Sequence, residues 1–177
     1  MEVNSGKILA LASYPTYDPN IWQVGLTQKQ ATNLFSESSG VPALNRPLQG
    51  MYAPASTFKS ISAVAAINAG YNMNSSYKCP AKVLIGNREF ANFETKSQGT
   101  INMKRAIAVS CDTIWYQIAY DEWVRDGGLF PKSGLHDYFF TAARGFGLGK
   151  ITGIDLPSEA SGRLPDRAWK EAVYKEN

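Results

Sequence analysis

The sequence predicts a mixed α+β fold, with a pair of strands near the N-terminus and mainly helices after it. Residues 3–12 have the pattern of a strand, a tight turn ending at Gly6 and an apolar strand. Residues 56–69 form the clearest helix, with apolar residues near helical spacing and Gly70 at the end. Because two strands alone make a marginal sheet, this inventory is unusual for a finished domain.

The remaining elements follow from capping residues, breakers and periodicity. Thr27 is expected to cap a short helix over residues 27–35, and Asn102 to cap a helix that runs through Ala108. The sequence further predicts loops at 36–42, 126–136 and from 149 onward, an irregular segment at 45–55, a strand-like stretch at 82–85, and helices at 113–124 and 138–146.

The composition is that of a globular protein and excludes several other classes. The 177 residues are 44% hydrophobic and 12% aromatic, which is too apolar for a disordered chain and enough for a core. No apolar run approaches the roughly 18 residues that suggest a membrane-spanning helix. The net charge of +3 comes from scattered basic residues, which argues against a nucleic-acid partner.

The two cysteines and the single histidine predict no metal site and no cofactor. Cys79 and Cys111 are too far apart in sequence for a zinc-binding spacing, and His136 is the only imidazole. The pair permits one disulfide without demanding it. Because Cys111 lies between apolar runs, a buried free thiol is the favoured expectation.

Ser56-Thr57-Phe58-Lys59 is the first candidate for catalysis. Residues i and i+3 lie on one face of a helix, about 5–6 Å apart at Cβ, so the serine hydroxyl and the lysine amine can meet. Serine is a weak nucleophile until a base takes its proton, and a lysine amine does this only when neutral. The first turn of a helix also favours developing negative charge. Ser56 and Lys59 are therefore predicted as nucleophile and base.

This tetrad alone is weak evidence, because Ser75-Ser76-Tyr77-Lys78 repeats its spacing. The second tetrad lies in a polar stretch with no apolar helix behind it, so we predict that it belongs to a surface loop. The first tetrad stands at the head of a helix of small residues that is suited to burial.

Ser110-Cys111-Asp112 strengthens the catalytic interpretation. It falls between two predicted helices and is the only Ser-x-Asp or Ser-x-Asn in the chain. Ser110 is placed to relay a proton between Lys59 and a leaving amine, and Asp112 to orient Lys59 or to bind a substrate amide. The alternative is that Asp112 simply caps the helix that follows, and both roles can hold at once.

These motifs resemble those of penicillin-binding proteins and serine β-lactamases, which add a Lys-Thr-Gly triad. The resemblance is closest to the transpeptidase domain of elongation-type class B members, penicillin-binding protein 2. Five segments carry it, in order: 6–15, 45–54, 110–120, 146–149 and 152–157. It implies the fold of that family, a three-layer arrangement with an antiparallel sheet flanked by helices.

The resemblance also implies an activity, that of a D,D-transpeptidase that cross-links peptidoglycan without a cofactor. Ser56 would attack the D-Ala–D-Ala carbonyl of a stem peptide, Lys59 would be the general base and Ser110 the proton shuttle. Asp112 would stand at the substrate-binding position where many relatives carry Asn. β-Lactams would acylate the serine, cell-elongation membrane proteins would be partners, and the location would be the outer side of the bacterial cell membrane.

Two departures from the family pattern lead to further expectations. Ala55 replaces the usual Gly before the nucleophile, and since alanine does not adopt positive φ cheaply, an ordinary backbone is expected there. The Lys-Thr-Gly triad is missing. Lys132-Ser133-Gly134 is rejected as a substitute, because it lacks a strand pattern and precedes the match at 146–157. The triad is therefore expected beyond Asn177.

Residues 1–177 are accordingly predicted to be the N-terminal portion of one transpeptidase domain. Such a chain is expected to be acylated poorly in isolation, and a second chain with the remaining strands is a candidate partner. Two alternatives stay open. A penicillin sensor or class D-like β-lactamase would share the fold but hold or hydrolyse the acyl group. A non-catalytic binding module or inactive fragment would carry the serine and lysine incidentally.

Overall fold

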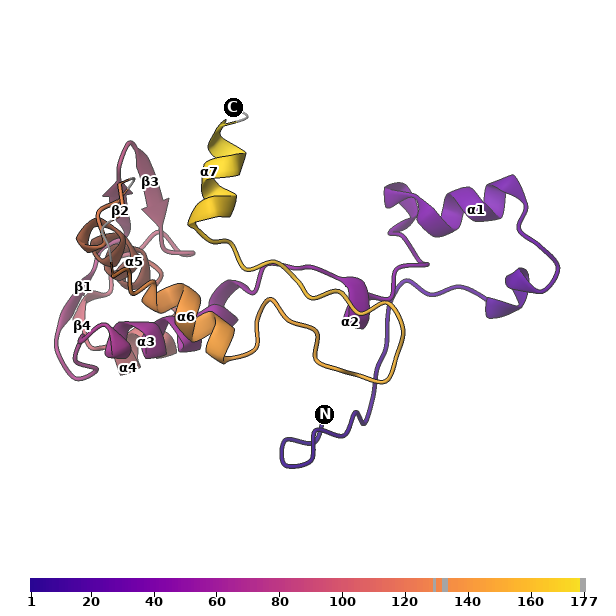
Figure 1. Cartoon of the computed structure of the whole chain (residues 1–177), viewed down its shortest axis with the longest axis horizontal. Helices are drawn as coiled ribbons and strands as arrows, with labels where there is room; N and C mark the ends of the chain where they lie inside the picture. Colours follow the sequence, from indigo (N-terminus) through magenta and orange to yellow (C-terminus); the bar gives the residue numbers. More distant parts are fainter. Residues whose placement is uncertain (129, 132–133, 176–177) are drawn as a thin grey trace. The chain divides into compact units, whose positions relative to one another are not determined.

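The computed structural model describes residues 1–128, 130–131 and 134–175, which divide between two compact units (Figure 1). Unit 1 comprises Met1–Tyr52 and Ile151–Gly162, and unit 2 comprises Ala53–Lys150 and Arg163–Asn177. Both candidate motifs lie in unit 2, so one unit contains the whole candidate site. None of the helices in the described ranges has the length and apolarity that crossing a bilayer requires.

Unit 1 is built from short helical elements. These are η1 (Pro19–Trp22), α1 (Gln28–Phe35), η2 (Glu37–Ser39) and α2 (Arg46–Gln49). The predicted cap of α1 is confirmed, because the Thr27 hydroxyl accepts from the backbone N–H of Gln30 while the Gln30 side chain accepts from that of Thr27. The prediction of an irregular segment at 45–55 missed α2, which has Pro47 in its first turn, where a fixed φ suits a helix.

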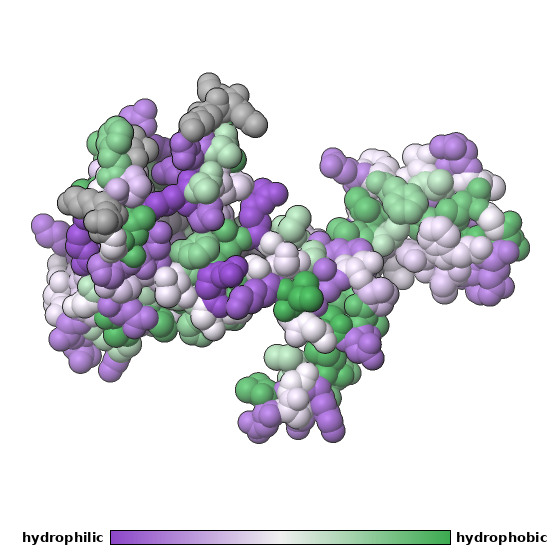
Figure 2. Space-filling model, in the orientation of Figure 1, coloured by the Kyte–Doolittle hydropathy of each residue, from purple (hydrophilic) through white to green (hydrophobic). Residues whose placement is uncertain are grey.

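The predicted strand pair at 3–12 is wrong, although its turn is present. The Gly6 N–H donates to the carbonyl of Glu2 at 2.9 Å, and Gly6 has φ +72°. None of residues 1–12 is in a strand, and Leu9 is 73% exposed. Figure 2 shows hydrophobic residues on the surface of this segment. A strand needs a partner for its backbone groups, and none of the described segments pairs with this one.

Helices are the main regular elements of unit 2. The turn η3 (Ala55–Phe58) leads into α3 (Lys59–Asn68), and α4 (Met103–Ala108), α5 (Thr113–Arg125), α6 (Tyr138–Gly145) and α7 (Arg167–Lys175) follow. α3 packs against α4, α5 and α6 (Figure 1). Asn102 caps α4 as predicted, and the expected apolar stripe of α5 is buried at Ile114, Trp115 and Ile118.

The strands form two separate two-stranded antiparallel sheets. β1 (Tyr77–Cys79) pairs with β4 (Gly99–Ile101), and β2 (Lys82–Ile85) pairs with β3 (Arg88–Ala91). Only β2 was predicted, because strands of three or four residues are too short to show a periodicity. Helices with antiparallel sheets confirm the predicted fold class.

Three segments differ from the predicted loops, and the first is 36–42, which contains η2. Lys78 lies in β1, paired with Thr100, while Ser75 is in an exposed turn as expected. The chain after residue 149 is irregular up to Asp166, but α7 then forms because the Asp166 carboxylate accepts from the N–H of Trp169 at 2.7 Å. Lys132 and Ser133 of the rejected Lys-Ser-Gly lie outside the described residues.

Cys79 and Cys111 are joined by a disulfide, so the favoured free thiol is wrong while its burial is right. The two residues are 0% and 1% exposed. Their Cα atoms are 6.4 Å apart, within the range that a disulfide spans, because β1 packs against the turn between α4 and α5. The sulfurs lie in the main core of unit 2, with Met103, Ala106 and Ile114.

Candidate active site

The head of α3 brings Ser56 and Lys59 together. Ser56 lies in η3, and Lys59 is the first residue of α3. Residues i and i+3 eclipse one another in a 3-10 turn, which places the lysine over the serine. The Lys59 amine accordingly donates to Ser56 Oγ at 3.2 Å.

Ala55, the residue before Ser56, adopts a left-handed backbone with φ +47°. The expectation of an ordinary backbone is therefore wrong. Such a conformation is costly for a residue with a Cβ and persists only where surrounding structure enforces it. Part of that structure is the turn at Pro54, whose carbonyl accepts from the N–H of Thr57 at 3.2 Å.

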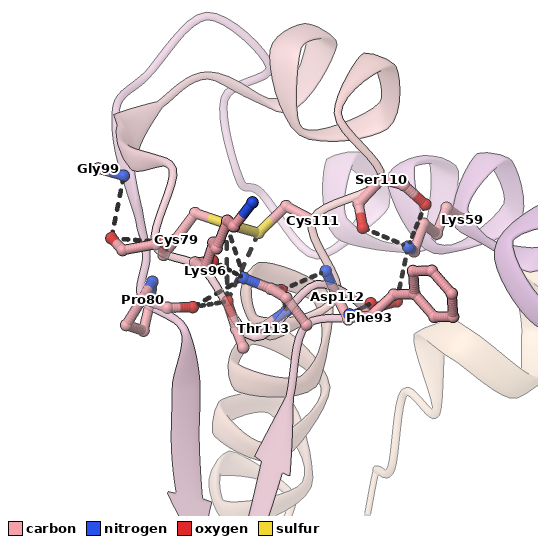
Figure 3. The surroundings of a disulfide bond; sticks show 12 residues. Lys59, Cys79, Pro80, Phe93, Lys96, Gly99, Ser110, Cys111, Asp112 and Thr113 are labelled. Atoms are coloured by element: carbon pink, nitrogen blue, oxygen red, sulfur yellow. Dashed lines mark hydrogen bonds and ion pairs between the residues drawn. A yellow bond between two sulfur atoms is a disulfide. The ribbon is translucent and has the colours of Figure 1, made fainter.

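Ser110 is the second residue of the site in the left-handed region, with φ +55°. The Lys59 amine donates to its carbonyl oxygen at 2.7 Å and to its hydroxyl at 2.8 Å (Figure 3). Ser56 Oγ and Ser110 Oγ are 2.9 Å apart. This backbone conformation thus presents both polar groups of Ser110 to the lysine and its hydroxyl to the candidate nucleophile.

Asp112 forms an ion pair with Lys59 instead of capping α5. Its Oδ1 lies 2.6 Å from Lys59 Nζ, in a pair whose side chains are 19% and 9% exposed. Asp112 stands at the N-cap position of α5, but its side chain makes no capping hydrogen bond. The other carboxylate oxygen accepts from the backbone N–H of Phe93 at 3.3 Å (Figure 3). Of the three roles considered for Asp112, the structure shows the contact with lysine and no side-chain cap, while the binding of a substrate amide stays a prediction.

These contacts give a connected polar network across one cavity wall. The Lys59 side chain is nearly buried, so its hydrogen bonds and its ion pair are electrostatically stronger than they would be in water. Its amine touches the candidate nucleophile, the Ser110 hydroxyl and a carboxylate. This arrangement can move a proton between Ser56 and Lys59 either directly or through Ser110.

An open cleft of about 880 Å³ lies beside the network, a size typical of small-molecule and peptide-end sites. Ser56, Lys59, Ser110 and Asp112 line it, together with Phe93, Gln98, Trp115 and Tyr116. Burial, and then the negative charge of Asp112, raise the pKa of Tyr116, so its hydroxyl stays protonated as a donor at the cleft wall.

Ser75 and Lys78 of the second tetrad do not line this cleft. Sequence analysis missed the buried Asn92, whose side chain binds the backbone of Asp112, because the strand before it was not predicted. A single Asn after a polar stretch offered no signal. In the described part of the chain, no group of three or more His, Cys, Asp or Glu residues is arranged to hold a metal ion.

Comparison with known proteins finds the same architecture. Residues 1–176 match the family model of the penicillin binding protein transpeptidase domain. A relative from Salmonella typhimurium, named peptidoglycan D,D-transpeptidase MrdA, is 35% identical over 175 residues, covering 97% of this chain and 26% of the relative. The chain thus spans about a quarter of that relative's length.

Two solved structures are similar in fold. PBP2 of Helicobacter pylori, solved in complex with MreC, has a TM-score of 0.77 and 25% identity over 94% of this chain and 29% of that one. Penicillin-binding protein A of Mycobacterium tuberculosis, solved as a penicillin G acyl-enzyme complex, has a TM-score of 0.64 and 28% identity over 93% and 37%. The chain therefore belongs to the penicillin-binding protein transpeptidase domain family, in which it is similar to the class B proteins of the PBP2 type.

Proposed function

We propose that this chain supplies the nucleophile, the base and the proton relay of a peptidoglycan D,D-transpeptidase. The observation that carries the proposal is the position of the Lys59 amine, within hydrogen-bond distance of both Ser56 and Ser110 and paired with Asp112. The name of the Salmonella relative supports the reaction class. The acyl-enzyme of the Mycobacterium protein supports β-lactams as substrate mimics.

In the proposed acylation, Ser56 Oγ attacks the carbonyl carbon of the penultimate D-Ala of a stem peptide. The hydroxyl proton passes to the Lys59 amine, and the backbone N–H of Ser56 helps to stabilise the oxyanion. The C–N bond then breaks, and the terminal D-Ala leaves as an amine after it receives a proton through Ser110. The amine of a second stem peptide then attacks the acyl-serine ester and gives up a proton to the network of Lys59 and Ser110. The bond between the acyl carbon and Ser56 Oγ breaks, and Oγ takes up a proton from the same network, which frees Ser56.

We also propose that residues 1–177 are the N-terminal portion of a longer transpeptidase domain, since they span only about a quarter of the curated relative. The missing Lys-Thr-Gly strand would supply the second oxyanion N–H. Fluorescent penicillin should accordingly label the isolated 177-residue chain far more slowly than the full-length protein. Equal rates would contradict this part of the proposal.

A location outside the cytoplasm has a physical argument in its favour. The buried disulfide suits an oxidising compartment, where such bonds persist, and that is where peptidoglycan lies. The Helicobacter relative was solved with MreC, which supports a cell-elongation membrane partner for this protein too.

The test is labelling of the full-length protein by fluorescent penicillin, followed by mass mapping of the adduct. Ser56→Ala should abolish labelling, and the adduct should lie on the peptide that contains Ser56. The second tetrad offers a matched control, because Ser75→Ala removes a serine with the same spacing to a lysine and should label like the parent. Unchanged labelling of Ser56→Ala would refute the catalytic role. Rapid hydrolysis of a chromogenic cephalosporin would favour a β-lactamase.

A further inference from the structure

We propose that Asn92 is a positioning residue for the Ser110-Cys111-Asp112 turn and acts on Lys59 through Asp112. The proposal rests on the transpeptidase function proposed above. Asn92 directly follows β3 and is 7% exposed, although it belongs to neither catalytic motif. A polar side chain buried this deeply has to be matched by hydrogen-bonding partners, and the identity of those partners shows what it holds.

The Asn92 carboxamide forms hydrogen bonds with backbone groups of three segments. Its Oδ1 accepts from the N–H groups of Asp112 at 2.9 Å and Thr113 at 3.1 Å. Its Nδ2 donates to the carbonyls of Pro80 and Lys96, both at 2.9 Å. An amide has one oxygen with two acceptor sites and one NH₂ with two donors, so a carboxylate or an aliphatic side chain of this size cannot replace it.

These bonds fix the backbone of Asp112. An N-cap side chain usually accepts from the second or third N–H of its helix, which the Asp112 carboxylate does not do here. Asn92 accepts instead from the N–H groups of Asp112 and Thr113, and so holds the backbone from which the Asp112 carboxylate extends to Lys59. The next residue, Phe93, donates its N–H to that carboxylate (Figure 3). Asp112 is therefore held at two points, its backbone by Asn92 and its carboxylate by Phe93.

Removal of the Asn92 amide would leave the backbone of Asp112 without its anchor. The N–H groups of Asp112 and Thr113 would lose their acceptor, and their indirect link to the Pro80 and Lys96 carbonyls would be lost. A shift of this backbone would lengthen the 2.6 Å contact between Asp112 Oδ1 and Lys59 Nζ. The amine would lose the group that orients it between Ser56 and Ser110, and small misplacements of catalytic groups slow reactions strongly.

The experiment measures acylation of the full-length protein by fluorescent penicillin, separating the acylation rate constant from the dissociation constant of the encounter complex. Asn92→Ala should lower the rate constant by about ten- to a hundredfold and leave the dissociation constant within about twofold. Asn102→Ala is the matched control, because it removes an asparagine that accepts from a backbone N–H at the head of another helix, α4. It should lower the urea midpoint of unfolding and leave the rate constant unchanged.

A double-mutant cycle distinguishes positioning from a general loss of structure. If Asn92 acts through Asp112, Asn92→Ala should slow the Asp112→Ala variant by less than about twofold. A parent-like rate in Asn92→Ala, or an equal loss in both backgrounds, would overturn the proposal.

If Asn92→Ala does not fold, Asn92→Asp takes its place in the cycle. It keeps the shape and the acceptor but opposes a carboxylate to the Pro80 and Lys96 carbonyls, and it should be slowed at least about threefold. A parent-like rate in this variant would also overturn the role of Asn92. A parent protein that penicillin never labels at Ser56 would overturn the proposed function together with it.

Discussion

The disulfide between Cys79 and Cys111 makes the most quantitative prediction. Its two sulfurs are fully buried and join residues 32 positions apart. A cross-link closing a loop of that length removes about 12 cal/mol/K of entropy from the unfolded chain, or about 3.7 kcal/mol at 25 °C. Cys79→Ala/Cys111→Ala should therefore lower the free energy of unfolding by about 3–5 kcal/mol, which includes the lost burial of two sulfurs.

The measurement is urea unfolding of the full-length protein and the double variant, each with and without reductant. Reductant should lower the free energy of unfolding of the parent and leave that of the variant unchanged. Because Cys111 is the middle residue of the Ser110-Cys111-Asp112 turn, the variant should also be acylated more slowly by penicillin. The reasoning is refuted if the variant loses less than about 1 kcal/mol. It is also refuted if iodoacetamide labels both cysteines in the unreduced, denatured parent.

Three further predictions test the backbone and the titratable groups. Ala55→Gly should raise the free energy of unfolding by about 0.5–1 kcal/mol in urea unfolding, because it relieves φ +47° but loosens the unfolded chain. Burial, and then the charge and hydrogen bond of Glu122, raise the pKa of Tyr71 from 10.0 to about 12, so its stabilisation is complete below pH 10 and lost from there toward pH 12. In Tyr71→Phe, the free energy of unfolding should change less with pH between pH 10 and pH 12 than it does in the parent. Hydrogen bonds from Thr152 lower the pKa of Glu159 below 4.5, so its stabilisation is lost as the pH falls below that value, and Glu159→Gln should reduce the acid sensitivity of unfolding.

Local signals in the sequence found several helices, including those that carry the candidate site. A cap at Thr27, a cap at Asn102 and an apolar stripe after Asp112 each depend on neighbours within a few residues, and each is present in the structure. The Ser-x-x-Lys spacing likewise needs only one helical turn to bring Ser56 and Lys59 together. Interactions of this kind can be predicted without knowledge of the rest of the chain.

Two of the predictions that failed depended on distant partners. The strand pair at 3–12 had the right pattern, but a pattern forms a strand only where another strand supplies hydrogen bonds. The free thiol at Cys111 was expected because the approach of β1 is not visible in the sequence. The ordinary backbone expected at Ala55 followed from the cost of positive φ, which the surrounding turn overrides.

The sequence therefore specified the candidate catalytic residues, because residue type and helical spacing are local properties. Their arrangement depends on packing between segments far apart in the chain. Ser110 contacts Lys59 from 51 positions away in the sequence, and Asn92 binds the backbone of Asp112 from 20 positions away. A carboxylate that looks like a helix cap in the sequence becomes the partner of a nearly buried lysine, because distant segments place the lysine amine beside it.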